Sequence, residues 1–206
     1  AWPAEAVAIP ALNTRFVADA VRQREEALRM AEEDRAARPR GASFHGHYFS
    51  QQWSVYGSSP RLLSLAAKID TFTGGAHGNS AYKVLLWDRS NDGEVDFSAL
   101  FTDAAAAYSA LTPLYCAELD RQRAKKRRES LPLQGEGWMV ECPPLAEQEI
   151  AAVDTDNNGR FDTLRVLIAP YGAGPCAEGS YEVDVPLTAP VLRLVRSDYS
   201  AEFQTQ

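Results

Sequence analysis

The alternation of apolar and polar residues between positions 63 and 70 constrains the fold of this chain more than any other feature. One side of an extended chain carries Leu63, Leu65, Ala67 and Ile69, and the other carries Ser64, Lys68 and Asp70. A repeat of two residues is typical of a half-buried antiparallel strand, which has one face on a core and one in water. The chain therefore contains an antiparallel sheet that needs a second layer to cover it.

Other apolar segments predict the rest of the sheet. Residues 43–56 are rich in aromatic side chains, and Phe49, Trp53 and Val55 share one face of an extended strand. Residues 82–87 are apolar on both faces, which indicates a central strand, and tight-turn residues then lead into residues 94–97. Further strands are expected at residues 161–168 and 181–185, with a third at 191–195.

Two regions have the helical repeat. Val17, Val21, Leu28 and Ala31 recur at spacings that favour one helical face, with Asn13 as a cap before them, and Pro39 is expected to end this helix. Residues 103–128 are also helical in pattern. Because proline suits the first turn of a helix, we expect Thr112 and Pro113 to start a second helix there.

The order of these elements predicts an α+β fold, an antiparallel sheet with helices packed on one face in a single compact domain. A chain of 206 residues suits one domain, with residues 1–40 as an N-terminal strand and helix region and residues 41–206 as the main sheet and helices. Apolar runs stay below the roughly 18 residues of a membrane span, so no span is expected within this sequence.

The charge balance bears on partners. The formal net charge is −7, from 21 Lys and Arg against 28 Asp and Glu, which argues against a nucleic-acid-binding protein and favours a cationic partner. Basic residues crowd into 121–128, where they are expected to face solvent at a helix end or to touch an anionic surface.

The three cysteines have no C-x-x-C spacing. If the protein is exported, Cys116 and Cys142 are plausible disulfide partners and Cys176 remains free; in a cytosolic protein all three would be buried thiols. The sequence begins without a charged and apolar leader, so we expect that an export signal was removed or never existed.

The segment from Asp154 to Asp162 has the spacing of a calcium loop. Its ligand positions are Asp154, Asp156, Asn158, the carbonyl of Arg160, and Asp162. Gly159 takes the turn position, but Arg165 stands where an EF-hand has its bidentate glutamate. The segment therefore predicts either a structural cation site or a hydrogen-bonded turn without metal.

Histidine chemistry offers weaker signals. His45 and His47 would share one face of a strand, a geometry that suits zinc, although no complete ligand set accompanies them. His77 lies in a glycine-rich loop without the spacing of a phosphate cradle. We find no catalytic constellation, and the chain is expected not to be an enzyme.

Three segments resemble a known family. They are Thr73-Gly74-Gly75-Ala76-His77-Gly78, then Val95 to Phe101, then Ala169 to Gly179 leading into residues 181–186. Over residues 5–190 their order is similar to that of an extracytoplasmic bacterial domain of unknown function, the domain of the lysozyme-binding anti-sigma factor RsiV. The chain differs at Phe72, where tyrosine is common, and at Cys176, where an aromatic residue is usual.

The resemblance implies an exported α+β domain at the periplasmic or extracellular face of the bacterial envelope, tethered by an upstream lipid anchor. It also implies a binding role, since some relatives attach this domain to a polysaccharide deacetylase. The loop of Thr73, Gly74, Gly75 and His77 is then the candidate ligand-binding loop. The expected partner is a lysozyme-like cationic protein or cell-wall glycan, with Trp53, Tyr56 or Trp138 as aromatic platforms for the glycan.

Two other functions stay open at this point. One is an envelope hydrolase that uses His77 as general acid or base, because histidine titrates near neutrality. The other is a structural envelope protein stabilised by calcium.

Overall fold

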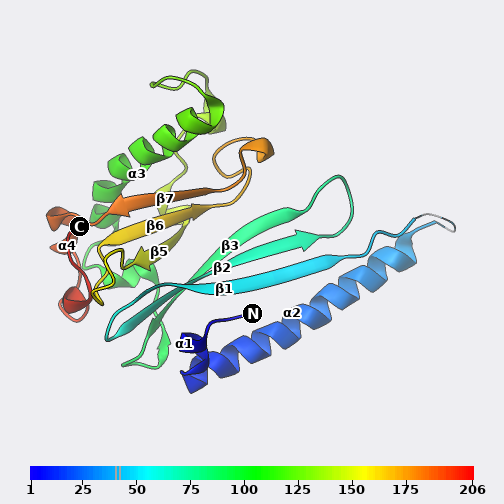
Figure 1. The fold of residues 1–206 in the computed structure, drawn as a ribbon, viewed down its shortest axis with the longest axis horizontal. Coiled ribbons are helices and arrows are strands. Elements are labelled where there is room, and N and C mark those ends of the chain that lie inside the picture. The colour runs from blue at the N-terminus through cyan, green and yellow to red at the C-terminus, as the bar shows by residue number, and fades with distance from the viewer. Residues whose placement is uncertain (40, 42) are drawn as a thin grey trace. The chain divides into compact units, whose positions relative to one another are not determined.

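The computed structural model describes residues 1–39, 41 and 43–206, and the chain forms two compact units (Figure 1). Unit 1 consists of residues 1–54 and 67–81, and unit 2 of residues 55–66 and 82–206. The chain is built from antiparallel sheets and helices, and residues from both contribute to the buried core. This confirms the predicted α+β class. The predicted internal boundary at residue 40 lies outside the described residues.

A four-stranded sheet has the order β1-β2-β3-β4, with strands β1 (Tyr48–Ser58), β2 (Leu62–Phe72), β3 (Asn79–Asp88) and β4 (Gly93–Glu94). β2 is internal, and residues 62–67 are buried on both of its faces, Ser64 included. The expected half-buried pattern was therefore wrong for this part of β2, and an exposed side chain first appears at Lys68.

Unit 1 combines one end of this sheet with the short helix α1 (Ala4–Val7) and the long helix α2 (Pro10–Ala37). α2 buries Leu12 and Phe16, and the Phe16 ring stacks on Trp53 of β1 at a centroid distance of 4.9 Å. Arg38 has an extended backbone and Pro39 follows it, so the helix ends where the sequence predicted.

Two expectations for α2 were wrong. The helix begins at Pro10, and Asn13 lies inside it, where its Oδ1 accepts a hydrogen bond from Trp2 Nε1 at 3.0 Å instead of capping the helix. Val17 and Val21 are 46% and 52% exposed. The face of α2 that carries Phe16 packs on Trp53 of the sheet, so the face that carries the two valines is left toward solvent.

Unit 2 holds a second antiparallel sheet in the order β5-β6-β7, formed by β5 (Glu149–Val153), β6 (Thr163–Ile168) and β7 (Tyr181–Pro186). Helix α3 (Ala104–Arg127) packs against β7 and buries Leu111, Tyr115 and Leu119 in the core. Strands β6 and β7 confirm their predictions, whereas β5 was not expected.

Two more predictions failed in unit 2. Pro113 lies inside α3 and starts no second helix. Buried residues before and after it pack in the same core, so α3 continues through the proline as one helix. Residues 191–195 form no strand: helix α4 (Ala189–Leu192) covers their beginning, and Val195 makes only an isolated bridge to Phe101. No helix in the described part of the chain is long and apolar enough to cross a membrane.

Candidate functional site

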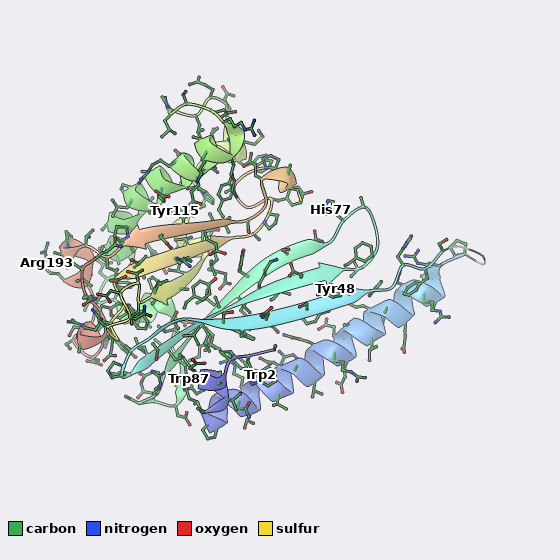
Figure 2. The ribbon with its side chains drawn as sticks, in the orientation of Figure 1. Trp2, Tyr48, His77, Trp87, Tyr115 and Arg193 are labelled. Atoms are coloured by element: carbon green, nitrogen blue, oxygen red, sulfur yellow. A yellow bond between two sulfur atoms is a disulfide. The ribbon has the colours of Figure 1, made fainter. Side chains whose placement is uncertain are left out.

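A groove of about 760 Å³ in unit 1 lies between α2 and the beginning of β1. Trp2 and Tyr48, both labelled in Figure 2, line it together with Thr71 and Thr73 at the end of β2. Its volume falls within the roughly 300–1,000 Å³ of small-ligand sites in proteins. Among the described residues, this groove is the strongest candidate for a ligand site.

The wall formed by α2 owes its shape to small side chains. Beyond Phe16 the residues that line the groove from the helix include Ala20, Ala27 and Ala31. A close-packed interface between helix and sheet requires larger side chains to fill the space. Because alanine has only a methyl group, the helix leaves open space beside β1.

The opposite wall exposes aromatic residues. Tyr48 is 57% exposed and Phe49 is 39% exposed, while Leu28 and Met30 of α2 are also solvent-exposed at the groove. Clustered apolar side chains of this kind mark interaction sites more often than isolated ones do. Polar groups, among them Asp19, accompany them and can orient a ligand.

The first residue of the chain borders the groove along the strand. The Ala1 amine donates to the Gln51 carbonyl oxygen at 2.8 Å, and the Ala1 carbonyl accepts from the Trp53 N–H at 2.9 Å. Figure 1 shows the N-terminus between β1 and α2. The edge of β1 is therefore covered at Gln51 to Trp53.

A charged cluster stands at the far end of α2. Asp34 Oδ2 accepts from Arg38 NH2 at 2.8 Å and lies 3.2 Å from Nε2 of His47, which lines the groove. The Arg38 guanidinium holds the pKa of the Asp34 carboxyl below its usual value, with His47 adding to the effect. Arg38 also donates to the Ser43 carbonyl at 2.7 Å, so this cluster ties the segment before β1 to α2.

The predicted loop contributes little to the groove. Of its four residues, Thr73 lines the groove, and Gly74 and Gly75 supply positive φ angles of 101° and 94°. His77 lies at the exposed tip between β2 and β3, where its Nδ1 is 2.9 Å from the Gly78 carbonyl oxygen (Figure 2). The glycines thus serve a strand connection, as their conformational freedom suggests.

The predicted metal positions comprise three carboxylates that lie close together and two other residues, Asn158 and Arg160, that do not belong to that cluster. Asp154, Asp156 and Asp162 have ligand oxygens within 4.8 Å of one another, and they form the one such cluster in the described part of the chain. Asp154 already accepts from the Gly159 N–H at 2.8 Å, and Asp162 from the Thr155 hydroxyl at 2.7 Å. Calcium binding here stays a prediction.

The remaining residues of this loop complete a hydrogen-bonded turn. Asn158 Oδ1 accepts from the Arg160 N–H at 2.9 Å, and the Arg160 guanidinium donates to the Phe203 carbonyl at 2.6 Å. His45 and His47 do not belong to the acidic cluster, since His47 pairs with Asp34.

The structure joins Cys116 and Cys142 in a disulfide with a Cα–Cα distance of 5.5 Å, and leaves Cys176 as a half-buried thiol.

The aromatic residues that the sequence suggested as glycan platforms differ in how exposed they are. Trp53 lines the groove but is 7% exposed and stacked on Phe16, so it offers no exposed platform, and Tyr56 is half-buried. Trp138 is 52% exposed but belongs to unit 2.

The charge of the chain is divided unevenly. Unit 1 contains eight basic and eight acidic residues, whereas unit 2 contains thirteen basic and twenty acidic ones, so the whole net charge of −7 belongs to unit 2. The groove therefore lies in the neutral unit. The negative charge from which the composition predicted a cationic partner is therefore carried by unit 2.

A family model described as deacetylase PdaC matches residues 4–80, a range that contains most of unit 1 and covers less than half of the chain. No curated protein matches the chain.

Two solved structures align with this chain. A member of the DUF3298 family from Bacteroides fragilis NCTC 9343 aligns with a TM-score of 0.53 at 22% identity, over 94% of this chain and 72% of that one. A DUF3298 family protein from Pseudomonas aeruginosa PAO1 aligns with a TM-score of 0.47 at 17% identity, over 73% and 63% of the two chains. The likeness to the first structure shows that the fold is shared.

Proposed function

We propose that this chain is a non-catalytic binding module of the bacterial envelope, of the RsiV type, and that the groove between α2 and β1 is its ligand-binding site. The observation that carries the proposal is the groove itself, which presents exposed Tyr48 and Phe49 opposite the alanines of α2. A concave, mainly apolar surface with a few polar groups is the usual form of a binding site.

A protein partner fits the groove best. Tyrosine and methionine are enriched in the cores of protein interfaces, and Tyr48 and Met30 are both exposed at the groove. The sequence resemblance points to a lysozyme-like protein. The acidic surface of unit 2 would speed the encounter with such a cationic partner, while the neutral groove would supply most of the contact.

Cell-wall glycan is the second candidate, and the exposed ring of Tyr48 favours it. A sugar face can stack on such a ring, while Asp19, Gln23 and Gln51 of the groove offer hydrogen bonds. A protein partner and a glycan would bury different areas of the apolar side chains that α2 presents to the groove.

The compartment belongs to the same proposal. The bond between Cys116 and Cys142 supports an oxidising compartment, because disulfides persist in the periplasm and outside the cell. We place the module at the periplasmic or outer face of the envelope, held there by a lipid anchor upstream.

Hydrolysis has less support than binding. His47 is placed against the Asp34 carboxylate, whereas the His77 ring faces the Gly78 carbonyl in an exposed loop. A His77→Ala variant that keeps its melting temperature and leaves wall fragments as intact as the parent protein does would support the binding role. Hydrolysis of wall fragments by the parent protein, lost in that variant, would overturn it.

The test of the partner is a calorimetric titration of the protein with lysozyme and, separately, with soluble peptidoglycan fragments, each at low and at high salt. Saturable lysozyme binding that Tyr48→Ala weakens would support the groove and a protein partner. Binding of the fragments alone, weakened by the same substitution, would assign the groove to glycan. Binding of neither would remove both partners.

A further inference from the structure

An apolar stripe along α2 is exposed to solvent. α2 runs as one continuous helix over residues 10–37 (Figure 1), and Val17, Val21 and Leu28 are exposed on one side of it. With Arg24 between them, they follow spacings of four, three and four residues, which keep a row of side chains on one face of a helix. Large apolar side chains gathered in this way mark an interaction site. Val17 and Val21 do not line the groove, so a groove ligand does not account for them.

The charges of α2 are divided between its two halves. Residues 10–24 contain three basic residues and one acidic residue, whereas residues 25–37 contain two basic and five acidic residues. In an antiparallel pair of such helices, the basic half of each lies beside the acidic half of the other, and the two helix dipoles also oppose each other favourably. A parallel pair would set like charges side by side. The charge pattern therefore matches a second copy of the same helix.

We propose that α2 packs on α2 of a second copy of this chain in an antiparallel dimer, with the stripe of Val17, Val21 and Leu28 in the contact. A two-fold axis makes such a contact self-complementary, because each residue meets the same partner residue on both sides. Unit 1 as a whole contains eight basic and eight acidic residues, so the pairing brings together units without net charge. The inference goes beyond the proposed function, since it assigns a partner to Val17 and Val21, which lie outside the groove.

The apolar side chains fix the register of the two helices. When Val21 lies opposite Leu28 of the second copy, Leu28 lies opposite Val21 of that copy, and the two-fold axis passes between residues 24 and 25. Arg24 then lies beside Glu25 of the second copy, and the axis repeats this pair on its other side. Both side chains are exposed in the single chain. The charge that interrupts the apolar row thus gains an opposite charge, and a polar residue in such a seam specifies its register.

The contact is limited in size. From Val17 to Leu28 the stripe covers about three helical turns, roughly 17 Å of the helix axis. Permanent dimers bury more surface than a contact of this length supplies, so we expect a reversible dimer that dissociates on dilution. Sedimentation equilibrium of the whole chain over a range of concentrations measures its dissociation constant. Val21→Glu, which would place a carboxylate against Leu28 of the second copy, should leave only monomer.

Exchanging the central charges tests the antiparallel register. Arg24→Glu and Glu25→Arg should each weaken the dimer by on the order of tenfold, because each sets like charges beside each other on both sides of the axis. The double variant with both substitutions has the composition and the net charge of the parent protein, and it restores opposite charges at these two positions. We therefore expect the double variant to recover most of the lost affinity.

Three results would overturn the proposal, provided that melting temperatures show that the variants fold. The first is a parent protein that stays monomeric up to on the order of 1 mM. The second is a dimer that neither single charge reversal weakens, since a contact elsewhere, or a parallel pair, would not respond to them. The third is a double variant that dimerises as weakly as the single variants do.

The groove is tested separately from this contact. Val21 lies outside the groove, so the Val21→Glu monomer can be titrated with lysozyme and with peptidoglycan fragments. Ligand binding by a parent protein that stays monomeric would support the groove and refute the dimer. A dimer that responds to the charge exchange in a protein that binds neither ligand would support the α2 contact and remove those ligands.

Discussion

Phe16 of α2 lies on Trp53 of β1 with ring planes 24° apart, and this stack holds the helix to the sheet next to the groove. Phe16 is 2% exposed, so Phe16→Ala should lower the free energy of unfolding by about 3–5 kcal/mol. Val17→Ala, one residue along on the exposed face, should change it by about 0.5 kcal/mol or less. Urea unfolding followed by tryptophan fluorescence measures both. Equal losses would contradict the helix orientation described above.

Gly57 of β1 lies against Phe161 within unit 2. A Cβ atom at this position would stand 2.7 Å from the Phe161 ring and 2.9 Å from the Asp154 backbone nitrogen. Gly57→Ala should therefore destabilise the protein by about 1–3 kcal/mol through overpacking. Gly46→Ala is the matched control, because a Cβ there meets open space. Thermal unfolding that ranks the two variants in the opposite order would refute this packing.

The buried Asp88 carboxylate makes stability depend on acid pH. Burial raises the pKa of Asp88, but hydrogen bonds from Arg61, at 2.7 Å for the shortest, and from the Ser90 N–H more than offset it, so the folded pKa lies below the usual value. A depressed pKa contributes stability above the unfolded value near pH 3.9, and this is lost as pH falls through the folded pKa.

Asp88→Asn isolates this contribution. We expect it to cost about 3 kcal/mol at pH 7, because the Arg61 guanidinium loses its charged partner, and to flatten the decline between pH 5 and pH 3. Chemical unfolding across that range gives both quantities. An unchanged pH profile in the variant would assign the acid sensitivity to other carboxylates.

The acidic loop gives a prediction for calcium. Because Asp154, Asp156 and Asp162 bring their oxygens within 4.8 Å, an added cation should relieve their repulsion and raise the melting temperature by mass action. Asp156→Asn should reduce the rise, and a chelator should remove it. A melting temperature that calcium leaves unchanged would mean that the turn is held by its hydrogen bonds alone.

Periodicity predicted the elements that bury one continuous face. The strand at 181–186 follows its apolar alternation, the strand at 163–168 is an apolar run buried on both faces apart from Arg165, and the long helix ends just before Pro39 as expected. β5 was missed because its Ile150-Ala151-Ala152-Val153 core is short and half alanine, which signals a strand weakly.

Of the residues first selected on α2, Leu28 and Ala31 line the groove and Val17 and Val21 do not, so the sequence alone did not identify the face that forms it. Positions 12, 16, 20, 23, 27 and 31 form a second helical stripe in the sequence, and it is this stripe that faces the sheet, with small residues after Phe16. Choosing between the two stripes requires the partner surface, since Trp53 decides which face packs. The alternation in β1 predicted that Phe49 and Trp53 share one face, but it did not predict which of the two side chains is buried.

Filling the groove tests the central claim most directly. Ala27→Trp places a large side chain on the groove wall, and Ala18→Trp places the same side chain on the opposite face of α2, outside the groove. With melting temperatures confirming that both variants fold, each is titrated with lysozyme beside the parent protein. The account predicts that Ala27→Trp weakens binding by on the order of tenfold or more while Ala18→Trp binds as the parent does. Equal affinity in all three proteins would contradict the groove as the binding site.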